Sequence, residues 1–466
     1  MPYKDLREFL ARLEKEGELR KIKVEIDPEY ELSAICRRAV DAHAPALLFE
    51  KVKGYSAPII ANLIATRKRF ALALETTIER TTEKWINALR KGPTEPVIVK
   101  DGPCKENILT SDEINLFELP WAIPKWHEKD GGPYITAPCV ISKDPETGWR
   151  NVGIYRMMVR DKRSTGFQLT PFRHMYISKS KAEAKGSRFP VAVAIGVDPV
   201  IWICAAAPFA YGVDEIAMAG TLRGEPVELV KCETIPVEVP ASAEIVLEGE
   251  VIPNVYKPEG PFGEFHGYYG GLYNREVFEI KAITYRNNPI YHASFTGVGT
   301  ENHILFSMSM QAEIIRTCSL PGLKNINILE DGVSMIAIAQ IEKKFEGAAN
   351  WVASAILGCE AARMIKYLVI VDEDINPFNM KEVLWAIATR TQPHRDIFIL
   401  PNTPGTSLDP SIQGDFNRKF GLISKMVIDA TKKPKEEFPE VPDVPQEIKR
   451  LVEKRWTEYG IDVQLA

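Results

Sequence analysis

Two glutamates at the ends of a short turn are the strongest candidates for chemistry in this chain. Glu259 and Glu264 enclose the spacer Gly-Pro-Phe-Gly. This spacer suits neither a regular helix nor a central strand, because proline has no backbone donor and glycine adopts angles closed to other residues. Carboxylates that lie close together, or share an arginine, titrate at different pH values, as acid–base catalysis requires. The alternative is a surface turn with two solvated glutamates, but the Gly-rich aromatic flank Tyr268-Tyr269-Gly270-Gly271 favours a site.

An arginine in an apolar segment is the second candidate. Arg156 lies in the run Val152–Val159, which we expect to be a strand. A charge inside an apolar strand needs a carboxylate or an anionic ligand. From these residues alone, an arginine at a strand edge that reaches solvent is equally well supported. Asn151 and Arg156 are an odd number of positions apart, so a regular strand places them on opposite faces unless Asn151 precedes the strand or a bulge intervenes.

Three separated side chains offer the donor atoms of a hard-cation site. Asn151, His174 and Glu215 supply an amide oxygen, an imidazole nitrogen and a carboxylate oxygen. This set suits Mn²⁺ or Mg²⁺, with a ligand phosphate completing the coordination. The wide spacing gives the inference little weight by itself, because a lone histidine beside an arginine is more often structural. Other histidines are also placed for a pocket, namely His266, His292 and His303.

Composition and motifs exclude several classes of protein. The 466 residues are too many for one ordinary core, and the net charge of −5 disfavours nucleic acid as a main partner. Seven scattered cysteines without a C-x-x-C pair suit reduced, mostly buried thiols and disfavour a structural zinc or iron–sulfur site. The sequence contains no G-x-S-x-G, Walker A or zincin motif, so hydrolases and nucleoside triphosphatases lack support.

The sequence predicts no membrane partner. The N-terminus has no apolar signal-peptide core, and Asp198-Pro199 interrupts the most apolar stretch, residues 189–212. We expect that stretch to form buried strands, Ile201–Ala206 among them, and the protein to be cytoplasmic.

The pattern of elements predicts a mixed α/β protein with several domains. Residues 1–114 and 306–440 alternate helical and strand patterns and predict two α/β domains. Residues 115–305 contain regularly spaced short strand patterns and predict a barrel or sandwich.

The C-terminal end is predicted to be an arm. A charged run at Lys432–Glu437 and several later prolines predict a linker. The linker leads to an expected helix around Gln446–Tyr459. We therefore predict that residues 441–466 form an oligomerisation arm that packs on a neighbouring subunit.

Together these segments resemble the UbiD family of prenylated-FMN-dependent (de)carboxylases. The ordered motifs span nearly the whole chain: Asn151 with Ile154-Tyr155-Arg156, Arg173-His174, Glu215 after the segment from Pro208, Glu259-Gly-Pro-Phe-Gly-Glu264, Leu222–Val230, Leu368–Ile375 and Ser424–Thr431. The resemblance implies a mixed α/β (α+β) multidomain fold. In that fold a central split β-barrel holds the flavin between flanking α/β domains, and a helical tail follows.

The resemblance also implies binding roles. Asn151, His174 and Glu215 match the positions that hold a divalent metal, Mn²⁺ or Mg²⁺, which bridges to the cofactor phosphate. The Ala205–Pro208 backbone matches the segment that contacts the flavin and K⁺, and its alanines leave only backbone contacts. Lys366 matches a lysine that reaches the cofactor phosphate. The full set implied to contact prenylated FMN is Asn151, Gly153, Ile154, Tyr155, Arg156, Arg173, His174, Ala206, Ala207, Pro208, Glu215 and Lys366.

Arg156, Glu259 and Glu264 match the catalytic Glu-Arg-Glu network of the family. The match implies that Arg156 binds the substrate carboxylate, Glu259 orients the guanidinium and Glu264 donates the proton that replaces CO₂. The implied reaction is the reversible non-oxidative decarboxylation of an aromatic, heteroaromatic or α,β-unsaturated carboxylic acid. Prenylated FMN would be the electron sink, a flavin prenyltransferase its supplier, and a homodimer or homohexamer the assembly.

Two alternatives stay open. An anhydromevalonate-phosphate-type decarboxylase of isoprenoid synthesis needs a second anion pocket, for which His292, His303, Arg316 and Arg390 are not obviously arranged. A split-barrel, reductase-like FMN-binding protein without decarboxylase activity has no need of the Glu-Arg-Glu trio. The substrate also stays open, although Phe295–His303 is expected to face it.

Overall fold

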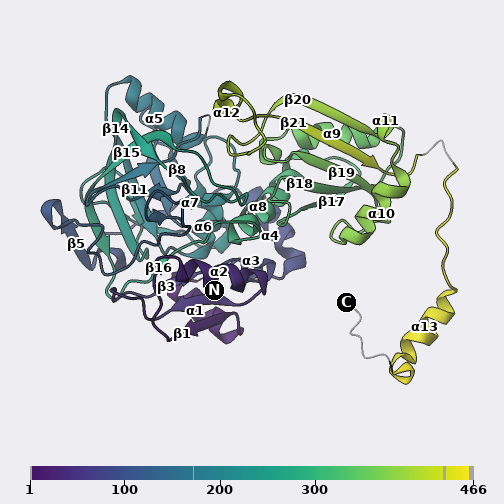
Figure 1. Cartoon of the computed structure of the whole chain (residues 1–466), viewed down its shortest axis with the longest axis horizontal. Helices are drawn as coiled ribbons and strands as arrows, with labels where there is room; N and C mark the ends of the chain where they lie inside the picture. The colour runs from purple at the N-terminus through teal and green to yellow at the C-terminus, as the bar shows by residue number, and fades with distance from the viewer. Residues whose placement is uncertain (1–2, 172, 434–436, 461–466) are drawn as a thin grey trace.

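Open sheets that follow one another along the chain form the frame of the protein, and helix α8 (Glu301–Cys318) connects the central sheet to the last one. The computed structural model describes residues 3–171, 173–433 and 437–460. Figure 1 shows the N-terminal segments at the bottom, the central sheet on the left, the last sheet on the right and the C-terminal tail apart from them. The architecture is mixed α/β with several domains, as predicted. The domain limits at residues 114, 305 and 440 stay predictions.

The first sheet combines strands that are far apart in the sequence. Its order is β1 (Leu19–Ile22), β2 (Ala46–Phe49), β3 (Ile59–Ala61) and β16 (Tyr291–His292). The helices of this region are α1 (Leu6–Lys15), α2 (Glu31–Asp41), α3 (Arg67–Ala73) and α4 (Thr81–Lys91). Asp5 caps α1 by accepting the Glu8 N–H, and four apolar side chains at helical spacing are buried: Leu6, Phe9, Leu10 and Leu13.

The central sheet delivers the candidate glutamates. Its seven strands include the path β10-β15-β14-β11-β7-β8, with β5 also paired to β15. Their bounds are β5 (Asn107–Thr110), β7 (Cys139–Lys143), β8 (Arg150–Gly153), β10 (Ser164–Phe167), β11 (Phe189–Ile195), β14 (Ile245–Glu259) and β15 (Tyr273–Tyr285). In the described part of the chain β10 and β8 do not pair, so the sheet is open rather than a closed barrel. The β14–β15 ladder ends at the pair Glu259↔Tyr273.

Smaller elements surround this sheet. They are β4 (Val97–Ile98), β12 (Glu228–Lys231) and β13 (Glu238–Pro240) in one sheet, β6 (Tyr134–Ile135) and β9 (Met157–Met158) in another, and the helices α5 (His174–Ala184), α6 (Pro199–Ala206) and α7 (Glu215–Arg223).

Helix α6 corrects one predicted strand, Ile201–Ala206. The Asp198 side chain accepts the Val200 N–H, and Pro199 occupies the first turn, so both recognised signals for a helix start are present. The strand prediction was wrong because residues 199–205 are all buried. A helix that is apolar on every side lacks the periodicity that distinguishes it from a buried strand.

The C-terminal sheet has the order β17-β18-β19-β21-β20. Strands β18 (Ile336–Ile341), β19 (Tyr367–Asp372) and β21 (Leu422–Ala430) run parallel, and β17 (Leu323–Ile328) and β20 (Ile397–Pro404) are antiparallel edges. The accompanying helices are α9 (Ala348–Gly358), the short 3₁₀ turn η4 (Glu360–Ala362), α10 (Met380–Arg390), α11 (Pro393–Asp396) and α12 (Asp415–Phe420).

The tail carries helix α13 (Gln446–Lys454) and a 3₁₀ turn at Trp456–Tyr459, where a helix was predicted. None of the α13 residues is buried. Of the predicted linker and arm, residues 434–436 and 461–466 lie outside the described residues. Within the described ranges, none of the helices is long and apolar enough to span a bilayer.

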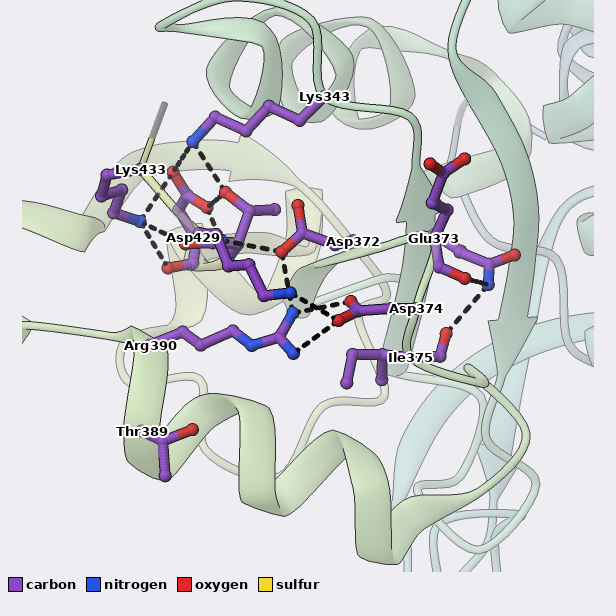
Figure 2. A network of polar contacts seen from close by, with 12 residues as sticks. Lys343, Asp372, Glu373, Asp374, Ile375, Thr389, Arg390, Asp429 and Lys433 are labelled. Carbon is purple, nitrogen blue, oxygen red and sulfur yellow. Dashed lines mark hydrogen bonds and ion pairs between the residues drawn. The ribbon is translucent and has the colours of Figure 1, made fainter. Parts of the chain in front are cut away.

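A group of charges lies at the carboxyl ends of the parallel strands β19 and β21 (Figure 2). The buried Arg390 guanidinium donates to Asp372 and Asp374, each at 2.8 Å. Its hydrogen bond lowers the pKa of Asp374 to about 2. The Lys432 backbone N–H donates to Asp372 at 2.7 Å, so the same carboxylates fix the point where the chain leaves the sheet.

We expect Arg390→Met to lower the free energy of unfolding by about 3 kcal/mol, because it leaves Asp372 and Asp374 without their buried cation. Urea unfolding followed by circular dichroism measures the change. Lys324→Met, which removes an exposed pair with Glu342 in the same sheet, is the control; it should change stability by less than about 1 kcal/mol. Equal losses of unfolding free energy in the two variants would contradict the stabilising role of Arg390.

Candidate active site

One cavity of about 300 Å³ collects most of the predicted site residues. Its walls come from the β8–β9 connection, the starts of α5 and α7, the end of α6, the turn after β14, helix α8 and segments flanking β19 and β20. The predicted residues that line it are Asn151, Gly153, Ile154, Tyr155, Arg156, Arg173, His174, Ala206, Ala207, Pro208, Glu215 and Glu264. Glu259 and Lys366 are not among the lining residues.

Arg156 joins the two candidate glutamates. Its Nη1 lies 3.0 Å from Glu264 Oε1, and its Nε lies 3.8 Å from Glu259 Oε1. The side chains of Arg156, Glu259 and Glu264 are only 12%, 1% and 4% exposed. The structure therefore brings the trio into one buried network, with Glu264 on the cavity side.

The turn between the glutamates is fixed by packing. Phe262 lies against Tyr134, with ring centroids 4.3 Å apart, and the Arg156 guanidinium lies 5.1 Å from the Phe262 ring. The Gly263 N–H donates to the buried Asp130 at 2.9 Å. A Cβ at Gly263 would lie 2.3 Å from the His127 ring, so only glycine fits this approach. The turn is thus a packed element rather than a solvated loop.

The position of Arg156 corrects the prediction of one strand over Val152–Val159. Strand β8 ends at Gly153 and β9 begins at Met157, so Ile154-Tyr155-Arg156 forms the connection between them. Alternation along one regular strand therefore does not apply, and Asn151 and Arg156 line the same cavity.

Two further arginines surround Glu259, and sequence reasoning missed them. Burial raises the pKa of Glu259, and the charges of Arg156, Arg275 and Arg160 oppose that shift. Burial also raises the pKa of Glu264, and the charges of Arg156 and Arg275 oppose this shift. Glu259 alone of the two has Arg160 among these opposing charges. Arg275 lies on the neighbouring strand β15, opposite Lys257, so only strand register could have revealed it.

Asn151 and Glu215 meet in the cavity wall. Asn151 Nδ2 donates to Glu215 Oε1 at 2.9 Å, and the Val152 N–H donates to Oε2 at 2.8 Å. Burial raises the pKa of Glu215 to about 8, and Asn151 Oδ1 is buried without a hydrogen-bond partner among the described residues. A cation could be coordinated by Asn151 Oδ1 together with a carboxylate oxygen of Glu215. His174, the first residue of α5, lines the same cavity, so the donor set fits a divalent metal.

The candidate metal site consists of one amide, Asn151, and two ionisable side chains, His174 and Glu215. Among the described residues there is no group of three or more His, Cys, Asp and Glu side chains that could hold a metal ion.

The wall beside His174 carries two arginines and one carboxylate, Glu360, which lies 3.6 Å from Arg363 Nη1. Arg173 and Arg363 both line the cavity, and burial together with the charge of Arg363 lowers the pKa of Arg173. Like charges held close in a buried site favour an anion such as phosphate between them. Sequence reasoning missed Arg363. Lys366 Nζ lies 2.8 Å from Asp409 and 2.7 Å from Ser411, and the contact of Lys366 with the cofactor phosphate stays a prediction.

The remaining predicted pocket residues divide into two groups. Thr296 and Asn302, from the segment Phe295–His303, line the cavity, but His266, His292 and His303 do not. His292 packs against Trp202, and burial lowers its pKa to about 3. His303 Nε2 lies 2.8 Å from the Phe265 carbonyl oxygen, which makes it a support for the turn. The apolar side chains of the lining include Phe262, Phe265, Phe306, Met310 and Leu408.

Comparison with known proteins identifies the class of enzyme. Three family models cover most of the chain: the N-terminal domain of 3-octaprenyl-4-hydroxybenzoate carboxy-lyase matches residues 10–89, its Rift-related domain residues 96–299 and its C-terminal domain residues 303–430. The chain belongs to the UbiD family and is a carboxy-lyase.

Relatives with solved structures share the fold along their whole length. The UbiD-class enzyme HmfF from Pelotomaculum thermopropionicum, solved with FMN, is 38% identical with a TM-score of 0.86, covering 96% of this chain and 99% of that one. Vanillic acid decarboxylase from Sedimentibacter hydroxybenzoicus, in closed form, is 34% identical with a TM-score of 0.88, covering 98% and 99%. A phenolic acid decarboxylase of the same organism is 35% identical over 448 residues, or 92% of each chain.

A methyl group at Gly166 tests whether activity depends on the position of the Glu259 carboxylate. A Cβ at Gly166 would lie 2.3 Å from Glu259 Oε2. We expect Gly166→Ala to displace the carboxylate from Arg156 and to lower kcat of decarboxylation at least tenfold. Gly358→Ala, where nothing lies within 4 Å of the added carbon, is the control and should keep full activity. Full activity in Gly166→Ala would show that the position of Glu259 is unimportant.

Proposed function

We propose that this enzyme catalyses the reversible non-oxidative decarboxylation of an aromatic, heteroaromatic or α,β-unsaturated carboxylic acid with prenylated FMN as cofactor. The observation that carries the proposal is the Arg156 guanidinium, held 3.0 Å from Glu264 at the cavity wall with Glu259 behind it. Flavin binding or metal binding alone would not require this buried trio. Family membership and the neighbours solved with FMN and prenylated FMN support the cofactor.

Arg156 is suited to bind the substrate carboxylate. A guanidinium forms two parallel hydrogen bonds to a carboxylate, and its charge persists at any working pH. Burial would lower the pKa of Arg156, but the two glutamates outweigh burial and raise it. Glu259 balances this charge and keeps the guanidinium oriented toward the cavity.

Glu264 is suited to carry the proton. Its pKa is raised by burial, which favours the neutral acid that can donate a proton. A substrate carboxylate on Arg156 would raise that pKa further, because it adds a negative charge beside Glu264. Prenylated FMN, when bound, supplies the electron sink that no side chain offers. Glu264 then protonates the carbon that loses CO₂, and it acts as the base in the reverse direction.

The other end of the cavity is suited to the cofactor phosphate. Asn151, His174 and Glu215 would hold Mn²⁺ or Mg²⁺, with Arg173 and Arg363 supplying positive charge beside it. The backbone of Ala206, Ala207 and Pro208 would contact the flavin and K⁺. A flavin prenyltransferase would supply the cofactor, and the tail would pack on a neighbouring subunit in a homodimer or homohexamer.

The alternatives gain no support from the site. Neither Arg316 nor Arg390 lines the cavity: Arg316 pairs with Glu313, and Arg390 belongs to the charge network of Figure 2. A second anion pocket for an anhydromevalonate phosphate therefore does not arise from these residues. Membership of a carboxy-lyase family argues against the reductase-like protein.

We expect Glu264→Gln to reduce decarboxylation by about 10²–10⁴-fold, the range typical of a lost general acid. Deuterium incorporation from heavy water into the product, over a panel of carboxylic acids, should fall in parallel. FMN affinity should stay unchanged, since an amide retains the shape of the acid. Glu118→Gln, at an exposed position, is the control. Full turnover by Glu264→Gln would refute the role of proton donor.

We expect Asn151→Ala and Glu215→Gln each to weaken Mn²⁺ binding at least tenfold, because the first removes an amide oxygen and the second removes the negative charge of a carboxylate. Electron paramagnetic resonance of free Mn²⁺ measures affinity without any turnover. Glu118→Gln again serves as the control. Unchanged Mn²⁺ affinity in both variants would place the metal elsewhere.

A further inference from the structure

Two cysteines beside the cavity have no part in the proposed reaction. Cys318 is the last residue of α8 and Cys359 follows α9 directly. Cys318 Sγ donates to the Ala355 carbonyl oxygen of α9 at 3.5 Å, one helical turn before Cys359, and the two thiols interact; both residues are partly exposed. A reagent from solvent can therefore reach two thiols that lie close to each other.

The surroundings of Cys359 favour its thiolate. The hydrogen bond from Cys318 lowers the pKa of Cys359 to about 6, with help from Thr317 and the N–H groups of Ala362 and Ala361 at the start of η4. Burial opposes this shift. The thiolate is the form that attacks disulfides.

Other charges and the partner thiol complete this environment. The Lys425 ammonium and Cys359 interact, and Lys425 Nζ donates to the carbonyl oxygens of Ala362 and Arg363. Glu360 and Arg363 are the remaining charged groups around Lys425. Cys318 keeps its proton, because its hydrogen bond to Cys359 raises its pKa.

The pair joins two elements that line the same cavity. The residues just after Cys359 line it through Glu360, Ala361, Arg363 and Met364, and α8 lines it through Asn302, Phe306 and Met310. A disulfide needs the two sulfurs about 2 Å apart, closer than any hydrogen-bonded contact. Forming the bond therefore draws the segment that carries Arg363 toward the end of α8.

We propose that Cys318 and Cys359 form a thiol–disulfide modification site that controls the end of the cavity where Arg173 and Arg363 lie. The Cys359 thiolate attacks a low-molecular-weight disulfide, forms a mixed disulfide and releases one thiolate. Cys318 then loses its proton to solvent and attacks the Cys359 sulfur, which releases the second thiolate. The protein loses two electrons in total, and the external disulfide is reduced to two thiols.

Peptide mapping tests the site itself. The reduced full-length protein is equilibrated with mixtures of oxidised and reduced glutathione, alkylated and digested. We expect a Cys318–Cys359 disulfide in the wild type, and glutathione held on Cys359 in Cys318→Ser. Cys104 and Cys232, which interact electrostatically but whose pKa values burial raises, should stay alkylated and are the internal control. No glutathione on Cys359 in Cys318→Ser, or earlier oxidation of Cys104 and Cys232, overturns the proposal.

A second measurement tests the coupling to the cavity, which rests on the proposed cofactor site. FMN binding is followed by flavin fluorescence for the reduced and oxidised protein. We expect at least threefold weaker binding after oxidation, and no change in a Cys318→Ser/Cys359→Ser variant given the same treatment. Equal affinity in both redox states of the wild type overturns the coupling. FMN binding in neither state overturns the coupling and the proposed cofactor together, while the peptide map still reports the disulfide independently.

Discussion

The buried charge of Arg156 is the constraint on which the rest of the site depends. A guanidinium that is 12% exposed needs carboxylates close by, and the chain supplies two from one turn. The β14–β15 ladder brings Glu259 to its end, and the packed Gly-Pro-Phe-Gly turn carries Glu264 to the cavity side. Arg160 and Arg275 add positive charge around Glu259. The two glutamates therefore occupy different environments although they are chemically identical.

The cavity lies between two parts of the fold, and helix α8 spans both. The central part provides the trio and the Asn151–Glu215 contact, whereas Arg363 and Leu408 come from segments next to the C-terminal sheet. The charge network around Arg390 lies at the carboxyl end of the parallel strand β19 of that sheet (Figure 2).

The sequence was sufficient to predict features that depend on neighbouring residues or that a recognisable motif encodes. The turn from Glu259 to Glu264 and the mixed α/β architecture are of this kind, and the family resemblance is confirmed. Periodicity failed for α6, which is buried on all sides, and a strand pattern concealed the loop that carries Arg156. Arg275 and Arg363 could not be chosen, because each reaches the site through strand register or long-range packing.

Lys366 and Arg363 show why sequence alone does not separate two basic residues of one segment. Both lie just before β19, and composition does not distinguish them. Each has a carboxylate partner, since Lys366 Nζ lies 2.8 Å from Asp409 and Arg363 Nη1 lies 3.6 Å from Glu360. Of the two, Arg363 lines the cavity, where its charge repels that of Arg173 and lowers the pKa of Arg173. An anion at this end would relieve that repulsion.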